Sequence, residues 1–238
     1  MAVRLVLILF ISLFSSFYVH AFSSYEMSES HKCSKMFPHF EKKFRIPLDT
    51  LHSIALRESG RRHKDHKIVV VWPWTVNVEG QGHYFDSKRE AIAFVRKQII
   101  KGKENIDVGC MQINLKHHLN AFNSLEQAFD PKENVGYGAE FLRSKYDQLG
   151  SWYKAIAHYH SATHERGSKY KEAVIKIANN MDLYKNSLRD YREKRLYNTS
   201  TSIPLTKKIM IGNNEVPKKS FFLIKNIEVL LWYVFQIK

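Results

Sequence analysis

The chain has 238 residues, 44% of them hydrophobic, and its 37 lysines and arginines against 23 aspartates and glutamates give a formal net charge of +14. This length and composition suit one domain with a real core, and two cysteines are too few for a small scaffold built on disulfides. The positive charge fits either an anionic partner, such as a cell-wall polymer or an acidic membrane surface, or a solvated basic surface. Nucleic acid is a poor candidate partner, because no helix-turn-helix, RNP or zinc-finger spacing occurs.

The first 21 residues have the pattern of a secretory signal. Arg4 precedes an apolar run over residues 5–17, and residues 19–21, Val-His-Ala, match the small-x-small pattern of a cleavage site. We therefore expect cleavage after Ala21 and an exported, periplasmic protein. The alternative is an uncleaved N-terminal anchor, although the apolar run is short for a membrane span.

The two cysteines, Cys33 and Cys110, both lie after this segment. In an oxidising compartment they form either one disulfide or two buried thiols, and the sequence leaves both states open.

A short helix is predicted around Phe37 and Phe40, and Pro47 then predicts the first turn of a second helix that ends at a glycine cap, Gly60. Glu58 is the unexpected member of this second helix, because it continues the apolar stripe of a buried face. The stripe consists of Leu48, Leu51, Ile54 and Ala55. A carboxyl group on a buried face tends to keep its proton, so Glu58 requires a chemical explanation.

An insertion is predicted over residues 68–101. Residues 68–78 are β-branched and aromatic, and "EGQG" provides a turn before "HYF", which together indicate a β-hairpin. Ser87 and Glu90 are spaced as a capping box and begin a helix that runs to about residue 101.

Three further helices follow. Asp130 and Pro131 predict the start of the first, which stops at Gly150, and Ser151 caps the next, over residues 152–162. Residues 167–181 form the last amphipathic helix. The core is therefore expected to be mainly helical.

The remaining residues, 187–238, form a basic tail that ends in an apolar segment over residues 221–238. Lys225, Asn226 and Glu228 interrupt this segment, which is also short for a membrane span. We expect an interfacial or partner-binding helix, with a membrane anchor as the alternative.

Four segments carry a family resemblance. "ALRESG" ends the second helix, "VGCMQIN" covers residues 108–114, "DPKEN" covers 130–134 and "AIAHYHSA" covers 155–162. In this order the segments resemble the lytic transglycosylases of the soluble lytic transglycosylase and goose-type lysozyme superfamily. The small domain with a signal peptide looks most like the transglycosylases that accompany type IV secretion. The resemblance implies a mainly α, lysozyme-like (goose-type) helical domain over residues 22–186, with the β-hairpin and helix at 68–101 as an insertion.

The resemblance also implies an activity. The expected reaction cleaves the β-1,4 bond between N-acetylmuramic acid and N-acetylglucosamine in peptidoglycan, without water, and forms a 1,6-anhydromuramyl product. It implies that Glu58 is the catalytic residue, first an acid and then a base, which agrees with a carboxyl group whose ionised form is disfavoured by burial. The implied partners are peptidoglycan strands and a type IV or similar secretion apparatus. Contact between the C-terminal helix and a membrane surface is expected from its apolar composition instead.

The resemblance also implies a set of substrate-binding residues, some of which have a second possible role. Ser59 either orients Glu58 or the substrate, or bonds to backbone at the helix end. Asn114 either contacts the ligand or caps a helix, and His160 stands where the family usually has asparagine. The full set of implied substrate contacts is Ser59, Met111, Gln112, Asn114, Tyr159 and His160.

A second carboxylate is not expected. Asp107 is interpreted as a loop or cap residue and Glu79 as a turn residue, so a mechanism with one carboxylate is favoured. Trp72, Trp74 and Tyr84 are candidates for stacking on sugars in a cleft wall formed by the insertion, although packing is favoured for the two tryptophans.

Two other functions remain open at this point. One is a hydrolytic lysozyme, which would need a second carboxylate, and the other is a non-catalytic peptidoglycan-binding component of an envelope machine. The twelve histidines do not have the spacing of a zinc site, and we expect neither a metal nor a cofactor.

Overall fold

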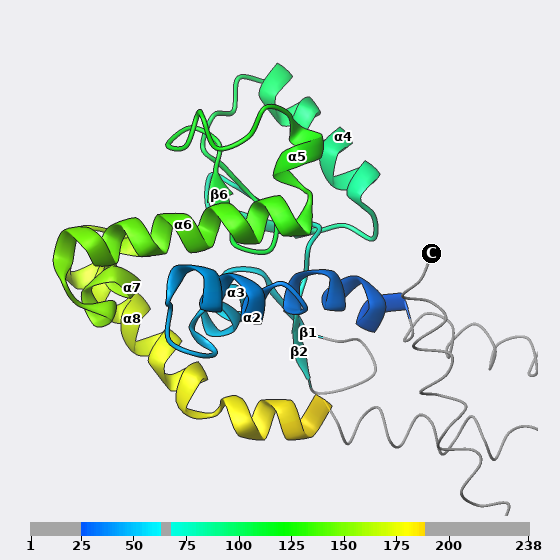
Figure 1. Ribbon diagram of the computed structural model, residues 1–238. Coiled ribbons are helices and arrows are strands. Elements are labelled where there is room, and N and C mark those ends of the chain that lie inside the picture. Colours follow the sequence, from blue (N-terminus) through cyan, green and yellow to red (C-terminus); the bar gives the residue numbers. More distant parts are fainter. Residues whose placement is uncertain (1–24, 63–67, 189–238) are drawn as a thin grey trace, which may run out of the picture. The chain divides into compact units, whose positions relative to one another are not determined.

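The computed structural model describes residues 25–62 and 68–188 (Figure 1). This part of the chain is mostly helical with small antiparallel sheets, which confirms the expected mainly α, lysozyme-like class. Within it, no helix is both long and apolar enough to cross a bilayer. The predicted signal segment and the apolar C-terminal segment lie outside the described residues.

The helical part is built from successive packed helices, flanked by two further helical segments over residues 25–34 and 181–188. Helix α6 packs on α7, α7 on α8, and α8 returns to pack on α3 (Figure 1). The end of α3 is thereby enclosed by elements far apart in the sequence. The helices are α2 (Phe37–Phe44), α3 (Thr50–Ser59), α4 (Lys88–Ile100), α5 (Leu125–Ala128), α6 (Pro131–Leu149), α7 (Trp152–His160) and α8 (His164–Asn179).

Two antiparallel sheets complete the fold. Strands β1 (Gly60–Arg62) and β2 (Val69–Val71) form the smaller sheet, and the larger has the order β4-β3-β5-β6. Its strands are β3 (Thr75–Val78), β4 (Gln81–Tyr84), β5 (Ile106–Val108) and β6 (Ile113–Asn114). The predicted hairpin is confirmed: β3 and β4 pair with Val78 opposite Gln81, and Glu79 and Gly80 make the turn, both with positive φ.

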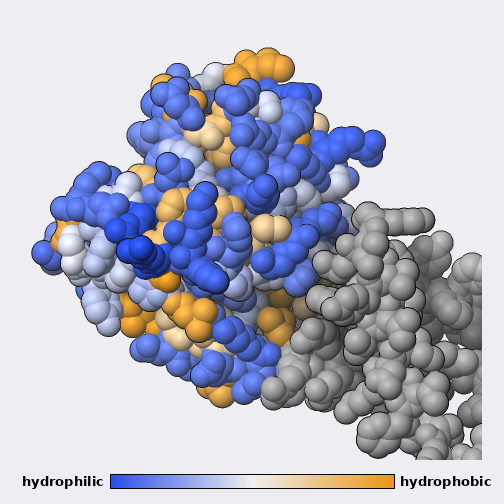
Figure 2. All heavy atoms as spheres, viewed as in Figure 1, coloured by the Kyte–Doolittle hydropathy of each residue, from blue (hydrophilic) through white to orange (hydrophobic). Residues whose placement is uncertain are grey.

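The apolar side chains form two clusters, one among the helices and one between α4, α5 and the larger sheet. Leu51, Ile54 and Ala55 of α3 are fully buried in the helical cluster, as the stripe predicts. Burying a leucine or isoleucine contributes roughly 1.5–3 kcal/mol, so this face holds α3 firmly in the core. The face shown in Figure 2 is largely hydrophilic, with apolar residues in separate small groups.

The start of α3 differs from the prediction. The helix begins at Thr50 rather than at Pro47, and Leu48 is 74% exposed instead of part of the stripe. The reason is tertiary, because the buried carboxyl group of Glu41 accepts hydrogen bonds from the backbone N–H groups of Asp49 (3.1 Å) and Leu51 (2.8 Å). A side chain from α2 therefore caps this helix, and the proline lies outside it.

This cap yields a stability prediction. Changing Glu41 to alanine will lower the free energy of unfolding by about 2 kcal/mol, because two backbone N–H groups at the start of α3 lose their acceptor. Urea unfolding followed by circular dichroism measures the change. Glu41→Gln keeps nearly the same volume but only one of the two acceptor oxygens, so it will lose part of this stability as well. No loss in either variant would contradict the capping role.

The C-terminal end of α3 is determined by the close packing of Gly60 against the carbonyl group of Leu56. Gly60 is the C-cap, but it is extended (φ −61°, ψ 118°) and begins β1, rather than having the left-handed conformation of a common glycine cap. A Cβ at this position would lie 2.2 Å from the carbonyl oxygen of Leu56, so only glycine fits. The chain therefore turns out of the helix directly after Ser59.

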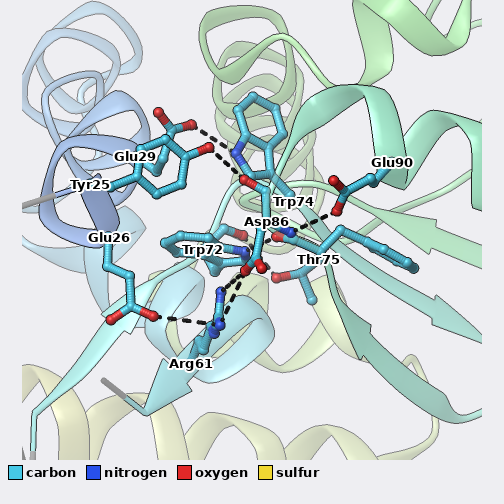
Figure 3. Close-up of polar contacts among 10 residues, drawn as sticks. Tyr25, Glu26, Glu29, Arg61, Trp72, Trp74, Thr75, Asp86 and Glu90 are labelled. Carbon is cyan, nitrogen blue, oxygen red and sulfur yellow. Dashed lines mark hydrogen bonds and ion pairs between the residues drawn. The ribbon is translucent and has the colours of Figure 1, made fainter. Parts of the chain in front are cut away.

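The aromatic residues of the insertion pack inside the domain instead of lining a cleft. Trp72 and Trp74 are buried; the Trp74 indole donates to Glu29 of the N-terminal helical segment, and the Trp72 indole donates to the Phe85 carbonyl (Figure 3). Arg61 stacks over Trp72, with its guanidinium carbon 4.4 Å from the ring centre. The packing interpretation is thus confirmed for both tryptophans.

Tyr84, at the end of β4, also makes a hydrogen bond within the domain. Its hydroxyl donates to the carbonyl of Gly60 at 3.0 Å, and its ring is 47% exposed. Tyr84 is not among the residues that line the cleft described below, and its stacking on a sugar stays a prediction.

Candidate active site

A polar cleft of about 450 Å³ lies at the end of α3. One group of lining residues comes from the larger sheet and its connections, and the other comes from α6, α7 and the start of α8. The lining residues are Glu58, Asn77, Asn105, Asp107, Gln112, Ile113, Asn114, His117, His118, Phe141, Tyr159, His160, Ser161 and Arg166. Asn77 of β3 belongs to the predicted insertion, which therefore contributes to the cleft wall.

Glu58 lies in the last turn of α3, where the buried stripe meets the cleft, and its side chain is half-buried. Desolvation raises the pKa of Glu58 to about 7, with a smaller contribution in the same direction from the Asp107 carboxyl. Tyr170 and Arg57 oppose this shift. The carboxyl group can therefore hold its proton near neutral pH and release it when a cation or a hydrogen-bond donor approaches.

Tyr170 of α8 is the neighbour that sequence reasoning missed. It is 4% exposed, and its hydroxyl has no partner at full hydrogen-bonding geometry among the described residues. The hydroxyl nevertheless lies close enough to Glu58 to favour the ionised carboxylate, and the ring stacks under His160 with centroids 4.7 Å apart. Only the packing of α8 on α3 and α7 brings Tyr170 here, so no local motif signals it.

The segment over residues 109–112 forms the floor between α3 and the sheet. Gly109 and Gln112 have positive φ values of 82° and 47°, and a Cβ on Gly109 would lie 2.4 Å from the amide nitrogen of Asn134. Asn134 is fully buried; its amide oxygen accepts from the N–H of Met111 (2.8 Å), and its nitrogen donates to the carbonyls of Val108 (2.9 Å) and Ala128 (3.0 Å). One side chain of α6 thus fixes the path of this segment.

One disulfide and one hydrogen bond hold the same segment from the other side. Cys33 and Cys110 form a disulfide with a Cα–Cα distance of 6.0 Å, one of the two states that the sequence leaves open. The Ser59 hydroxyl, fully buried, donates to the carbonyl of Cys110 at 2.7 Å and also lies 3.1 Å from the carbonyl of Ala55. The structure therefore places Ser59 behind the cleft, in the backbone-bonded position that was the alternative to substrate contact.

Met111 is likewise absent from the cleft surface. Its side chain is fully buried near Gly138 of α6, where a Cβ would lie 2.9 Å from the Met111 side chain. Its carbonyl oxygen accepts a hydrogen bond from the hydroxyl of Tyr159 at 2.9 Å. Met111 thus positions Tyr159, and the structure does not bring its side chain to a ligand.

Four predicted contacts do line the cleft: Gln112, Asn114, Tyr159 and His160. Both amide hydrogens of Gln112 are donated to backbone, to the carbonyls of Thr75 and Gly109 at 3.1 Å each, which leaves its amide oxygen as an acceptor. Asn114 lines the cleft, and its oxygen accepts from the N–H groups of Lys116 and His117 in a turn instead of at the start of a helix. Its contact with a ligand stays a prediction.

Asp107 corrects a prediction. It belongs to strand β5, opposite Asn114 of β6, and lines the cleft with Glu58 instead of lying in a loop. Desolvation raises its pKa, while a hydrogen bond from the Asn114 amide (2.8 Å) and the nearby His117 and His160 oppose that shift. Glu79, by contrast, is the turn residue predicted and pairs with Lys103 at 2.5 Å.

Residues 35–181 match the family described as the transglycosylase SLT domain. The match covers more than half of the chain and includes every residue that lines the cleft. No curated protein and no solved structure matches the chain. The chain belongs to the SLT transglycosylase family and is accordingly a lytic transglycosylase, a lyase that acts on the peptidoglycan of the cell wall.

Proposed function

We propose that Glu58 is the single general acid and base of this enzyme, which cleaves the β-1,4 bond between N-acetylmuramic acid and N-acetylglucosamine. The observation that carries the proposal is the position of Glu58, on a buried helix face that opens into the polar cleft, with a pKa raised to about 7. The neutral carboxyl group donates its proton to the glycosidic oxygen as the bond breaks. The resulting carboxylate then accepts the proton of the muramyl C6 hydroxyl while that oxygen bonds to the anomeric carbon, which yields the 1,6-anhydro product.

The neighbours of Glu58 fit these two steps. The negative charge of Asp107 helps Glu58 to keep its proton before cleavage, and the Tyr170 hydroxyl favours the carboxylate formed afterwards. Gln112 and Asn114 present amide groups suited to the N-acetyl groups of the substrate. We assign Tyr159 and His160 to substrate contact, and Ser59 and Met111 to positioning of the cleft residues.

Product analysis tests the proposal. The purified protein is incubated with peptidoglycan sacculi, and the soluble fragments are identified by mass spectrometry. Anhydromuramyl ends support the proposed reaction. Reducing ends would indicate hydrolysis, for which Asp107, in the same cleft as Glu58, is the candidate second carboxylate, and Asp107→Asn would then abolish the activity. Binding without any release would favour the non-catalytic wall-binding role.

A pH profile provides a prediction about Glu58. The rate of release will fall as the pH rises through about 7, because the ionised carboxyl group cannot donate the proton that cleavage needs. Initial rates on soluble glycan strands between pH 5 and 9 measure this limb. A rate that stays constant from pH 6 to 8 would contradict the role of Glu58 as the acid.

Tyr170→Phe gives the complementary prediction. Loss of the hydroxyl will shift the alkaline limb to higher pH, because the interaction that favours ionised Glu58 disappears, and will lower kcat at pH 6 about three- to tenfold. The stability of the fold will change little, since the buried hydroxyl has no hydrogen-bond partner at full geometry within residues 25–62 and 68–188. If the alkaline limb of the pH–rate profile does not shift in Tyr170→Phe, Tyr170 does not influence the ionisation of Glu58.

We further propose export to the periplasm and a role in local wall remodelling during assembly of an envelope-spanning secretion machine, with the C-terminal segment touching the membrane surface. The leader pattern of residues 1–21 and the resemblance to transglycosylases of type IV secretion support this role. Fractionation of cells that express the full chain tests it. The processed protein is expected in the periplasmic fraction or on the membrane, released from the latter by high salt, and retention of the full-length protein in the cytoplasm would contradict export.

A further inference from the structure

The two sides of the cleft differ in chemistry. The side formed by the sheet and its connections presents neutral amides, together with Asp107 and the imidazoles of His117 and His118. These amides belong to Asn77, Asn105, Gln112 and Asn114. The side formed by α7 and α8 presents the imidazole of His160 and the guanidinium of Arg166, which is the one lysine or arginine among the described residues that line the cleft. Uncharged N-acetyl sugars explain the first side, but they provide no partner for positive charge on the second.

Arg166 and Arg57 are the two cations without partners at this end of the cleft. Arg166 is exposed in the first turn of α8, Arg57 is exposed in the last turn of α3, and neither makes an ion pair or side-chain hydrogen bond with any residue of the described ranges. Burial lowers the pKa of His160, the charges of Arg57 and Arg166 add to this shift, and the charge of Asp107 opposes it. Arg166 and the exposed His160 line the same cleft, and Arg57 directly precedes Glu58, which lines it too.

Among the described residues, the carboxyl groups that line this cleft, Glu58 and Asp107, do not neutralise the two arginines. Asp107 accepts a hydrogen bond from Asn114, and Glu58 holds its proton near neutral pH. Two guanidinium groups near one imidazole repel one another unless an anion lies between them, and guanidinium binds carboxylate through two parallel hydrogen bonds. This end of the cleft thus has the charge and the donors for a carboxylate of the ligand.

We propose that Arg166, with Arg57 and His160, binds a carboxylate attached to the muramyl lactyl group of the substrate strand. The inference rests on the proposed function, because that function puts a muramyl residue beside Glu58. The carboxylate has two sources in peptidoglycan: the lactyl group itself in strands without peptides, or the stem peptide in substituted strands. Arg166 is in this way a determinant of substrate specificity and not a catalytic residue.

The test compares three soluble glycan strands: strands with stem peptides, strands stripped of peptides by an amidase, and stripped strands whose lactyl carboxylates are converted to methyl amides. Arg166→Gln is expected to raise KM about three- to tenfold on a strand that carries the recognised carboxylate, with kcat little changed, and to leave KM unaltered on the neutral strand. An effect confined to substituted strands assigns the site to the stem peptide, and one confined to stripped strands assigns it to the lactyl group. Arg166→Lys will recover part of the loss, because the charge remains.

Arg89→Gln is the matched control. Arg89 is also an exposed arginine in the first turn of a helix, α4, without an ion pair or side-chain hydrogen bond to the described residues, and it does not line the cleft. An equal effect of Arg166→Gln on all three strands, or no effect on any, would overturn the carboxylate site. If the wild-type protein releases no anhydromuramyl product, the proposed reaction fails, and fluorescence anisotropy with the same three labelled strands still tests the site by binding alone.

Discussion

Replacing Glu58 with glutamine will reduce the release of anhydromuramyl fragments from sacculi by about 10³-fold or more. Glutamine has nearly the same size and keeps the polar contacts of the cleft, but it cannot donate a proton to the glycosidic oxygen. Glu172→Gln, which removes an exposed carboxylate of α8 outside the cleft, is the control and is expected to retain full activity. Substantial activity in the Glu58 variant would require a different acid.

The same variant will be more stable than the wild type above pH 7, by about 1–3 kcal/mol. In the unfolded chain Glu58 ionises near its ordinary pKa of 4.5, whereas the folded protein holds the proton to about pH 7. The wild type therefore loses stability as the pH rises from 4.5 to 7 and remains at the lower level above that range. Glu41 also has a pKa raised to about 7, but it is present in both proteins and cancels in their difference. Urea unfolding at pH 5 and pH 8 measures the effect, and equal differences at both values would contradict the raised pKa.

Asn134→Ala is expected to have the largest effect on stability, a loss of about 3–5 kcal/mol in the free energy of unfolding. The amide satisfies one backbone N–H and two backbone carbonyls in a site without exposure to solvent. Alanine removes all three of these buried hydrogen bonds at once, and it leaves a cavity next to Gly109. The activity of the folded fraction will fall as well, because the segment with Met111 and Gln112 loses its support.

Chemical unfolding at one pH measures this loss. Asn180→Ala is the matched control, since the Asn180 amide donates only to the carbonyl of Lys176 at an exposed position, and a change within about 0.5 kcal/mol is expected there. A loss below about 1 kcal/mol for Asn134→Ala would show that other groups or water replace its hydrogen bonds.

Local signals predicted most of the helices. Ser87 accepts from the N–H of Glu90, and Asp130 accepts from those of Lys132 and Glu133, as their spacing indicates, while Gly150 ends α6 in the left-handed conformation. Such caps depend on three or four neighbouring residues, so a sequence reveals them directly. The order of the four motifs along the chain also identified the family, because this order does not depend on how the segments between the motifs fold.

The failures have a common cause in contacts between distant segments. The start of α3 is determined by the Glu41 carboxyl group, and the sequence around Pro47 and Leu48 contains no sign of this contact. Strand pairing turned Asp107 toward the cleft, and the return of α8 to α3 brought Tyr170 to Glu58. A motif residue can also support the cleft without lining it. Ser59 does so through its hydrogen bond to the Cys110 carbonyl, and a sequence motif gives the residue type but not the direction of its side chain.

The disulfide makes the support of the cleft depend on the redox state of the compartment in which the chain is found. Cys110 immediately precedes Met111 in the cleft floor, and its partner Cys33 lies 77 residues earlier, in the N-terminal helical segment. A newly made chain in a reducing cytoplasm keeps both thiols, so noncovalent contacts alone hold its cleft floor, and closure of a loop of this length typically adds about 2–4 kcal/mol. The cleft is therefore expected to become more rigid when the disulfide forms, which an oxidising compartment favours.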